Sequence, residues 1–410
     1  MRGRGLALAF LTLAAIVGLA GGRAWLAVIA LSVLASWGLS AFYMRRFPEG
    51  VTVQRNAERE IVPWGGTVQY CVSLSNRKWL PLLRFKLADE IPQTVEVTEG
   101  RKTASYRVGR ANLEQELSLG PYQRAELRFT LTNLPRGAHV FGPTLIHSVG
   151  LYGDAPVDLE LGEPMRIVVW PKVIAVDGLP WERAGDDGMR SRQDWVRQDP
   201  LHIVGLRPYA NGDPARLIDR NVWARTGAPA SRLLGAALER QTWLIVDLTT
   251  ADRPWDGIDR PLAEQILSVA ASLAAREVAD GVQVGLFVNA PITGVACWVQ
   301  ISCGAGQAHL EAILTALGAV QPQPSIDLSA LVGRVGLARE SPATIVAGRL
   351  TPALAQASLL LSQRQVAHSL VIMEAPSTHC DFRPYGGRLY VAVLAGEDAD
   401  RCQLREVVAN

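Results

Sequence analysis

Apolar positions dominate the first part of the chain. From Gly5 to Tyr43 almost every residue is uncharged, apart from a short break at Gly21-Gly22-Arg23. A helix rises about 1.5 Å per residue, and a membrane span needs about 20 apolar residues. The run Ala24–Tyr43 meets this length and the run Gly5–Ala20 is close to it. The pattern therefore predicts a transmembrane helical hairpin over residues 1–46.

Basic residues flank this hairpin on one side of the membrane. Arg2 and Arg4 precede it, and Arg45 and Arg46 follow it. Because basic flanks stay in the cytoplasm, we expect a multi-pass protein of the cell inner (plasma) membrane with the bulk of its chain in the cytoplasm. Alternatively, the first run is a secretory signal peptide that is cleaved after Gly18-Leu19-Ala20. The second run would then remain as the anchor, and the compartment would be the same.

Between residues 47 and 175, apolar and polar residues alternate with a period of two in several short segments. Val68–Leu74 and Arg124–Leu131 alternate apolar and polar positions, which is typical of half-buried strands. Further short strands are expected at Val51–Gln54, Phe85–Leu87, Leu113–Leu119, Thr144–Val149 and Arg166–Trp170. Glycine and proline separate these segments, so the region is predicted to be an antiparallel β-sandwich-like domain.

Residues 241–410 have a different pattern, in which continuous apolar segments typical of buried strands alternate with segments typical of helices. A strand at Thr242–Leu248 precedes a helix that begins near Asp259, and this order repeats toward the end of the chain. Such an order predicts a C-terminal α/β (Rossmann-like) domain with a mainly parallel sheet. Ligands bind such sheets at the carboxyl ends of the strands, which favours the positions Asp247, Thr249 and Thr250.

Residues 176–240 combine a charged connector with a polar knot that lies in Leu206–Arg225. A turn at residues 211–214 would bring arginines toward Asp213 and Asp219. The arginines of this segment are Arg207, Arg216, Arg220 and Arg225. The knot is either a structural ion-pair network or a partner-binding surface. Its candidate residues are Arg207, Tyr209, Gly212, Asp213, Arg216 and Arg225.

The net charge and the absence of known motifs in the sequence argue against nucleic-acid binding and against several classes of enzyme. The 41 basic and 39 acidic residues give a net charge of +2, with no basic patch of the kind that binds nucleic acid. No phosphate loop, nucleophile elbow or HExxH motif is present, so we expect no catalytic residues. The alternative is an enzyme, hydrolase-like, that uses the strand ends around Asp247, with His309 or His368 completing an acid–base pair.

The loop Asp247-Leu248-Thr249-Thr250-Ala251 resembles the first metal-binding loop of von Willebrand factor A domains, Asp-x-Ser/Thr-x-Ser. Its last position departs from that pattern, because Ala251 offers no oxygen ligand. Arg349, in the loop after the strand at residues 344–347, is expected to repel a cation and to fill its place. We therefore expect no cofactor, with Mg²⁺ at Asp247 and Thr249 as the alternative.

The whole chain resembles the bacterial domain-of-unknown-function family fifty-eight. The family pattern Leu-Arg-x-Tyr-x-x-Gly-Asp-x-x-Arg-x-Ile is matched by Leu206, Arg207, Tyr209, Gly212, Asp213, Arg216 and Ile218, and Ala-Arg by Ala224-Arg225. The family usually has Trp where Arg220 stands. The resemblance implies a transmembrane hairpin, a β module and a von Willebrand factor A-like domain.

The resemblance also implies partners: a MoxR-type AAA+ ATPase and a transglutaminase-like membrane protein. Our leading hypothesis is therefore a membrane-anchored protein-interaction or scaffold protein that faces the cytoplasm and works in envelope-related assembly. A purely structural envelope protein, in which the β domain spaces the α/β domain from the bilayer, is a further alternative.

Overall fold

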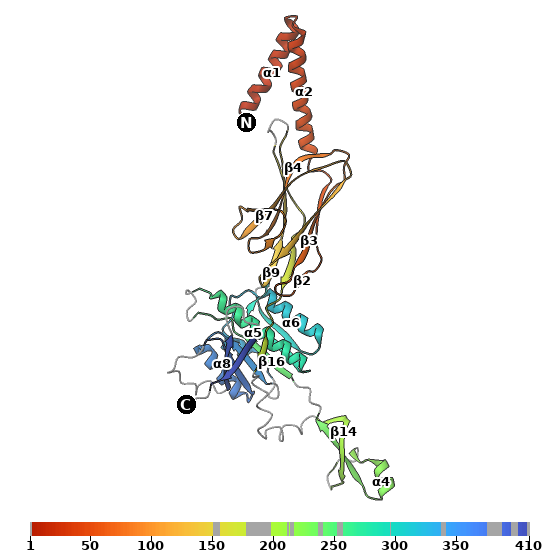
Figure 1. Cartoon of the computed structure of the whole chain (residues 1–410), viewed down its shortest axis with the longest axis vertical. Helices are drawn as coiled ribbons and strands as arrows, with labels where there is room; N and C mark the ends of the chain where they lie inside the picture. Colours follow the sequence, from red (N-terminus) through yellow and green to blue (C-terminus); the bar gives the residue numbers. More distant parts are fainter. Residues whose placement is uncertain are drawn as a thin grey trace. The chain divides into compact units, whose positions relative to one another are not determined.

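The computed structural model divides into two compact units, Met1–Trp170 and Pro171–Asn410, which are described separately below (Figure 1). The residues that it describes are 2–150, 156–177, 198–210, 213, 217–236, 241–251, 257–295, 297–337, 342–374, 388–394 and 401–407. The connector at Trp181–Gln198 lies outside these residues except for its last member.

The first unit begins with two helices, α1 (Arg2–Ala20) and α2 (Ala24–Arg46), which pack against each other (Figure 1). They approach closely at Gly18, where an added Cβ would lie 2.8 Å from the backbone nitrogen of Ala27. Small residues at such crossings let two apolar helices come together. Ala27 and Ala30 are accordingly buried although much of α2 is exposed.

Of the described helices, α2 alone is long and apolar enough to cross a membrane. The described apolar part of α1, Ala9–Ala20, is shorter than a span. The structure therefore supports one candidate span near the N-terminus, and the prediction of a multi-pass hairpin is not supported by it.

The end of α2 is built into the β domain. Phe47, directly after the helix, is fully buried in the core of that domain. The Tyr43 hydroxyl donates to the carbonyl of Pro81 (2.9 Å) and accepts from the amide of Leu83 (2.7 Å). The helix is therefore attached by packing and hydrogen bonds as well as by the peptide chain.

The rest of the first unit is made of mainly antiparallel sheets that enclose one apolar core. One sheet has the order β1-β3-β8-β5 and consists of β1 (Val51–Ala57), β3 (Val68–Asn76), β8 (Arg124–Thr132) and β5 (Glu96–Val97). The second has the order β11-β10-β4-β7-β6 and consists of β11 (Val157–Leu161), β10 (Thr144–Ser148), β4 (Leu82–Pro92), β7 (Arg110–Leu119) and β6 (Arg101–Ala104). A small third sheet joins β2 (Ile61–Val62), β12 (Met165–Val169) and β9 (Gly137–Phe141), and in it β2 and β12 form a parallel pair.

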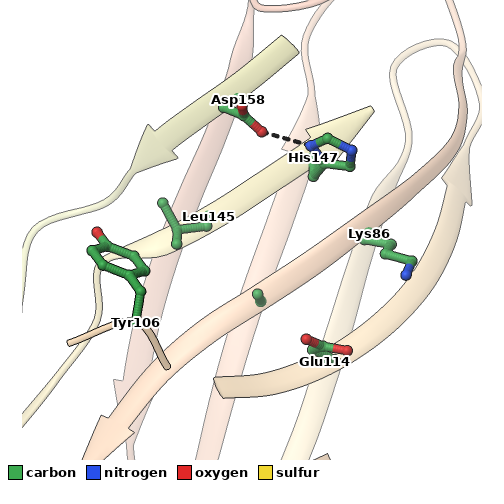
Figure 2. A pocket seen from close by; sticks show the side chains of 7 residues that line it. Lys86, Tyr106, Glu114, Leu145, His147 and Asp158 are labelled. Atoms are coloured by element: carbon green, nitrogen blue, oxygen red, sulfur yellow. Dashed lines mark hydrogen bonds and ion pairs between the residues drawn. The ribbon is translucent and has the colours of Figure 1, made fainter. Parts of the chain in front are cut away.

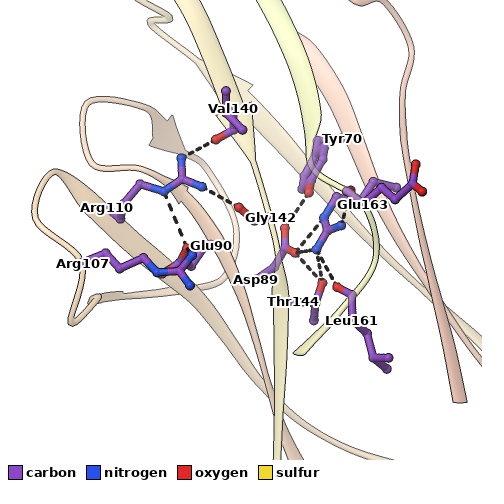
Figure 3. A network of polar contacts seen from close by, with 11 residues as sticks. Tyr70, Asp89, Glu90, Arg107, Arg110, Val140, Gly142, Thr144, Leu161 and Glu163 are labelled. Carbon is purple, nitrogen blue, oxygen red and sulfur yellow. Dashed lines mark hydrogen bonds and ion pairs between the residues drawn. The ribbon is translucent and has the colours of Figure 1, made fainter. Parts of the chain in front are cut away.

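A buried polar network ties the first sheet to the second (Figure 3). Arg55 on β1 forms an ion pair with Asp89 on β4 (Nη2–Oδ1 3.0 Å), with 2% and 0% of the side chains exposed. Tyr70 on β3 and Thr144 on β10 donate to the same carboxylate (2.5 and 2.6 Å). Burial first, and then the Asp89 charge, raise the pKa of Tyr70 well above its ordinary value.

The second unit contains an eight-stranded sheet of order β13-β22-β21-β20-β19-β16-β17-β18. Its strands are β13 (Ala175–Asp177), β22 (Arg401–Glu406), β21 (Arg388–Leu394), β20 (His368–Ile372), β19 (Ala343–Ala347), β16 (Gln241–Val246), β17 (Gln283–Pro291) and β18 (Trp298–Gly304). The five strands from β21 to β17 are parallel, whereas β18 and β22 pair antiparallel with their neighbours. The domain boundary expected at residue 175 therefore differs from the structure, because β13 pairs with β22 of this sheet.

Helices cover both faces of this sheet. They are α5 (Arg260–Ala279), α6 (Gln307–Ala319), α7 (Leu328–Arg334) and α8 (Pro352–Gln363). Ile245 and Ile345 share one core cluster with residues of α7 and α8. Leu244, which points the other way along β16, lines a small cavity with Leu273 of α5. The α5 helix begins as expected, because the Asp259 carboxylate accepts from the Leu262 amide (3.2 Å).

A separate two-stranded sheet completes the described part of this unit. It pairs β14 (Gln198–Pro208) with β15 (Ala230–Ala236), and the helix α4 (Arg220–Thr226) lies in the sequence between them. The segment falls in the region predicted to hold a connector and a polar knot. We call residues 205–236 the hairpin unit.

Candidate functional site

The switch point of the eight-stranded sheet lies at β16. The chain leaves β16 and reaches its neighbours β17 and β19 on opposite sides, and ligands of such sheets bind at the carboxyl ends of these strands. Asp247 follows β16 directly. Asn289 in β17 lies level with Asp247, because Val246 pairs with Val288. The sheet thus brings together two polar residues that are far apart in the sequence.

Hydrogen bonds close the loop that follows β16. The Asn289 Nδ2 donates to Asp247 Oδ1 (2.6 Å) and to Thr249 Oγ1 (3.3 Å). The Thr249 amide donates to the same Asp247 oxygen (2.9 Å), and the Leu248 amide donates to Asn289 Oδ1 (2.9 Å). The side chain of Asn289 therefore satisfies both the carboxylate and the backbone of this loop.

Burial determines the electrostatics of this site. Asp247 is 1% exposed, and its desolvation raises the pKa of its carboxyl group above the ordinary value. Hydrogen bonds from Thr249 and Asn289 oppose this increase, and the charge of Asp327 adds to it. Asp247 is the sequence-predicted residue that the structure places most deeply.

The donor set does not fit a divalent cation. Mg²⁺ requires oxygen ligands, yet Asp247 Oδ1 faces an amide N–H₂ and a backbone N–H. No group of three or more His, Cys, Asp or Glu side chains that could hold a metal ion occurs among the described residues. The residues around Asp247 and Thr249 thus form a hydrogen-bonded cluster, in which the amide of Asn289 contacts the carboxylate directly.

Arg349, which was expected to fill the place of a cation, pairs with a glutamate. Its guanidinium forms an ion pair with Glu374 (Nε–Oε2 2.7 Å) and also donates to it from Nη2 (2.8 Å). The Asp247 carboxylate accepts from the side-chain amide of Asn289 and from the backbone amide of Thr249. The sequence could not identify Asn289, because its position depends on the register of β17 against β16.

The acid–base pairs considered for an enzyme are not formed. His368 lies level with Trp243 through Ala343, four residues before Asp247, which corresponds to about 13 Å along a strand. Its Nε2 contacts Ser358 Oγ (2.6 Å) in the interior. His309 Nε2 contacts the carbonyl of Val284 (2.7 Å), also near the amino end of the sheet.

One ion pair expected for the polar knot is present in the hairpin unit. Arg207 Nη2 donates to Asp213 Oδ1 (2.6 Å), and the other oxygen accepts from Ser231 Oγ (3.0 Å) and the Ala210 amide (3.1 Å). The hydrogen bond from Arg207 is the largest of the causes that lower the pKa of Asp213. Asp213 therefore connects β14 to β15.

The second carboxylate of the hairpin unit caps α4. Asp219 Oδ1 accepts from the amides of Asn221 (3.0 Å) and Val222 (3.2 Å), and the Val222 amide is the main cause of the lowered pKa of Asp219. Its Oδ2 accepts from Arg232 Nε (3.0 Å). Sequence reasoning missed Arg232, although a lone arginine in the apolar run of β15 was a signal for it.

The other described members of the predicted knot do not join these ion pairs. Arg225, like Arg220, is exposed on α4, and neither forms an ion pair with a described residue. The amide of Tyr209 donates to the carbonyl of Pro229 (3.0 Å), and its side chain is half-buried. Gly212 and Arg216 lie outside the described residues.

A shallow hollow of about 420 Å³ lies on the five-stranded sheet of the first unit (Figure 2). Its lining residues are Lys86, Ala88, Tyr106, Glu114, Leu145, His147 and Asp158. His147 Nδ1 contacts Asp158 Oδ1 across β10 and β11 (2.6 Å). Sequence reasoning missed this hollow, because its side chains come from five separate segments.

Residues 205–375 match a family model described as "Protein of unknown function DUF58". This match supports the resemblance of the chain to the DUF58 family. The DUF58 match includes the hairpin unit and the cluster around Asp247, and it excludes the helices and β sheets of the first unit. No curated protein matches the chain.

Solved structures match only a part of the chain. The CARDB domain of a Pyrococcus furiosus protein, crystallised with di-metal ions, is 18% identical over 30% of this chain and 94% of its own, with a TM-score of 0.21. A cohesin module from a family 33 glycoside hydrolase of Clostridium perfringens is 11% identical over 29% of this chain and 96% of its own, with a TM-score of 0.20. At these scores the similarities decide neither fold nor function.

Proposed function

We propose that this protein is a membrane-anchored interaction or scaffold protein whose second unit binds a MoxR-type AAA+ ATPase in the cytoplasm. The observation that carries the proposal is α4, a helix in which no residue is buried. Trp223 on this helix is 47% exposed, and Asp213 and Asp219 hold the strands and helix around it in place. Exposed aromatic residues on an ordered support are typical of protein interfaces.

The remaining features of the chain are consistent with that role. The candidate span α2 ends in Arg45 and Arg46, which favours a cytoplasmic position for the residues after it. A multi-pass arrangement requires α1 to enter the membrane with α2, and their close contact at Gly18 would favour joint insertion. A transglutaminase-like membrane protein is a second partner that this location permits.

The second unit has the parallel sheet and strand-end loop expected of a von Willebrand factor A-like domain, and such a domain is suited to binding other proteins. In this chain Asn289 closes the loop around Asp247, so partner binding does not require a cation there. We infer an interaction protein rather than an enzyme, because both candidate histidines lie near the other end of the sheet from Asp247.

Co-purification tests the proposal. Full-length tagged protein would be extracted with detergent from membranes of its host, and the captured AAA+ ATPase would be quantified by mass spectrometry. We expect Trp223→Ala to lower the captured amount at least about tenfold, as for a central aromatic residue of an interface. The matched control is Trp79→Ala, which removes another exposed tryptophan, in the first unit. Thermal melting of each variant separates lost binding from lost folding.

Failure of the wild-type protein to enrich an ATPase above a tag-only sample would overturn the proposed partner. Equal capture by the wild type and Trp223→Ala would overturn the proposed surface. Protease treatment of intact spheroplasts tests the compartment, since a cytoplasmic unit should be protected. Digestion of the large fragment there would contradict the assigned orientation.

A further inference from the structure

We propose that the hairpin unit binds an acidic segment of the partner protein that also carries an apolar side chain. This inference rests on the proposed function, and it names the chemistry that the partner must present. Three features of the unit support it: an excess of positive charge, exposed apolar side chains beside that charge, and a fold too small to bury them.

The hairpin unit has a net positive charge. Residues 205–236 contain five arginines, two aspartates and no lysine or glutamate, which gives a net charge of +3. The entire chain has a net charge of +2 from 41 basic and 39 acidic residues, so the rest of the chain sums to −1. The hairpin unit is therefore basic in a chain that is otherwise nearly balanced, and this charge favours an acidic partner.

Both aspartates of the unit are already engaged. Asp213 accepts from Arg207, and Asp219 accepts from Arg232 and from the first amides of α4. Arg220 and Arg225 are exposed on α4 and form no ion pair with a described residue. Among the described residues, no carboxylate pairs with either of these two charges.

Apolar surface accompanies these arginines. Leu206 is 46% exposed and Trp223 is 47% exposed, and Leu206 lies opposite Arg232 in the ladder of β14 and β15. A two-stranded ribbon and a seven-residue helix cannot build a core of their own, and isolated hairpins are marginally stable in water. A partner that covers Leu206 and Trp223 would supply the missing apolar contacts.

A protein segment fits this surface better than a lipid bilayer. Helices that bind a membrane surface present an extended apolar face, whereas α4, Arg-Asn-Val-Trp-Ala-Arg-Thr, has only Val222, Trp223 and Ala224 as apolar residues. The hydrogen bonds that Asp213 and Asp219 accept from Arg207 and Arg232 hold the strands and α4 together as a support for this surface.

The direct test uses full-length protein in detergent and a fluorescent peptide of alternating glutamate and alanine with one central phenylalanine. We expect this peptide to bind, its lysine counterpart not to bind, and affinity to fall as salt is raised. Arg220→Glu/Arg225→Glu should weaken binding at least about tenfold, and Arg220→Gln/Arg225→Gln should have an intermediate effect. Arg334→Glu is the matched control, because Arg334 is an exposed arginine in the last turn of another seven-residue helix, α7.

Equal binding of the acidic and lysine peptides, no binding of either, or unchanged binding by the Arg220→Glu/Arg225→Glu variant would overturn the inference. So would stronger binding of the wild type to phosphatidylglycerol vesicles than to the peptide, because that would identify a lipid surface. Circular dichroism and thermal melting must show that the variants remain folded; if the glutamate variant does not, the glutamine variant decides by the same criteria.

Capture of the ATPase from membranes separates this inference from the proposed function. If the wild type and the glutamate variant retain the ATPase equally, the proposed function stands and the acidic-segment inference fails. If neither the wild type nor any variant retains it but the acidic peptide binds in the expected charge-dependent way, the ATPase partner is wrong and the inference stands.

Discussion

The side-chain amide of Asn289 donates a 2.6 Å hydrogen bond to the buried carboxylate of Asp247. The two residues lie level on the parallel neighbours β17 and β16, so this bond ties the carboxyl ends of two central strands together. The same amide group reaches Thr249, and the loop after β16 is thereby held in one conformation. The candidate site is therefore a buried polar cluster whose hydrogen bonds join β16, β17 and the loop after β16.

Removing the amide should destabilise the second unit. Asn289→Ala leaves Asp247 buried with one donor fewer, which typically costs about 1–3 kcal/mol of unfolding free energy. Urea denaturation of the purified protein measures the change. Gln300→Ala, at an exposed position of β18, is a control that should change stability little. Equal stability of Asn289→Ala and the wild type would show that the bond contributes nothing.

The raised pKa of Asp247 predicts a pH dependence of stability. The folded state holds this proton more tightly than the unfolded state, so the group contributes stability at low pH. That contribution falls as the pH rises above the unfolded pKa of about 3.9 toward the higher folded value. Asp247→Asn should therefore gain melting temperature relative to the wild type as the pH increases over this window. A difference in melting temperature that does not change with pH would contradict the assignment.

We expect substitutions of Arg55 and Asp89 to have strongly coupled effects on the stability of the first unit. Removing one member leaves the other buried and unpaired, so Arg55→Met alone should cost about 3–5 kcal/mol. Arg55→Met/Asp89→Leu should cost less than the sum of the two single variants, because no lone charge remains. Chemical denaturation of the four proteins gives the coupling energy. Simple additivity would show that the pair acts as two independent residues.

Alanine substitutions at Gly142 and Gly109 can distinguish the cost of a steric collision from the cost of backbone strain. Both have a positive φ, +84° and +75° respectively, so alanine is strained at either position. A Cβ at Gly142 would collide with the guanidinium of Arg55, whereas a Cβ at Gly109 meets nothing within 4 Å. Gly142→Ala should therefore destabilise the protein by about 1–3 kcal/mol more than Gly109→Ala. Equal losses by chemical denaturation would show that the Arg55 network adapts.

Magnesium should not affect the cluster around Asp247. The nearest donors to its carboxylate are N–H groups, which a cation would have to displace. Addition of MgCl₂ or EDTA should leave the melting temperature of the wild type unchanged, with CaCl₂ as a second cation. A magnesium-dependent increase that Asp247→Ala abolishes would overturn this view of the site.

Periodicity predicted most of the elements, because each strand or helix carries its own pattern. The alternation at Val68–Leu74 corresponds to β3, and the continuous apolar run that begins at Thr242 corresponds to β16. The rule that ligands lie at strand ends pointed to Asp247. Asn289 escaped prediction because a single amide in a buried strand becomes significant only when the strand order and register are known.

Other features were missed for the same reason. Arg55 and Asp89 lie on different sheets, and their pairing depends on how the sheets face each other across the core. A signal existed, since Arg55 occupies the inward position that Val51 and Val53 define along β1. Strand β15 was not predicted because Ala230–Ala236 has no strict alternation of apolar and polar residues. In addition, α4 lies between β15 and its partner strand β14 in the sequence.

The insertion between β13 and β16 makes the second unit modular. The sequence leaves the sheet after Asp177 and rejoins it at Gln241, and none of the eight strands contains a residue from between these points. Five strand spacings separate β13 from β16 in the sheet, which corresponds to about 24 Å. A flexible replacement of about ten residues or more would bridge that distance. The ladders of the sheet would survive such an excision, so we expect the eight strands to fold together without residues 178–240.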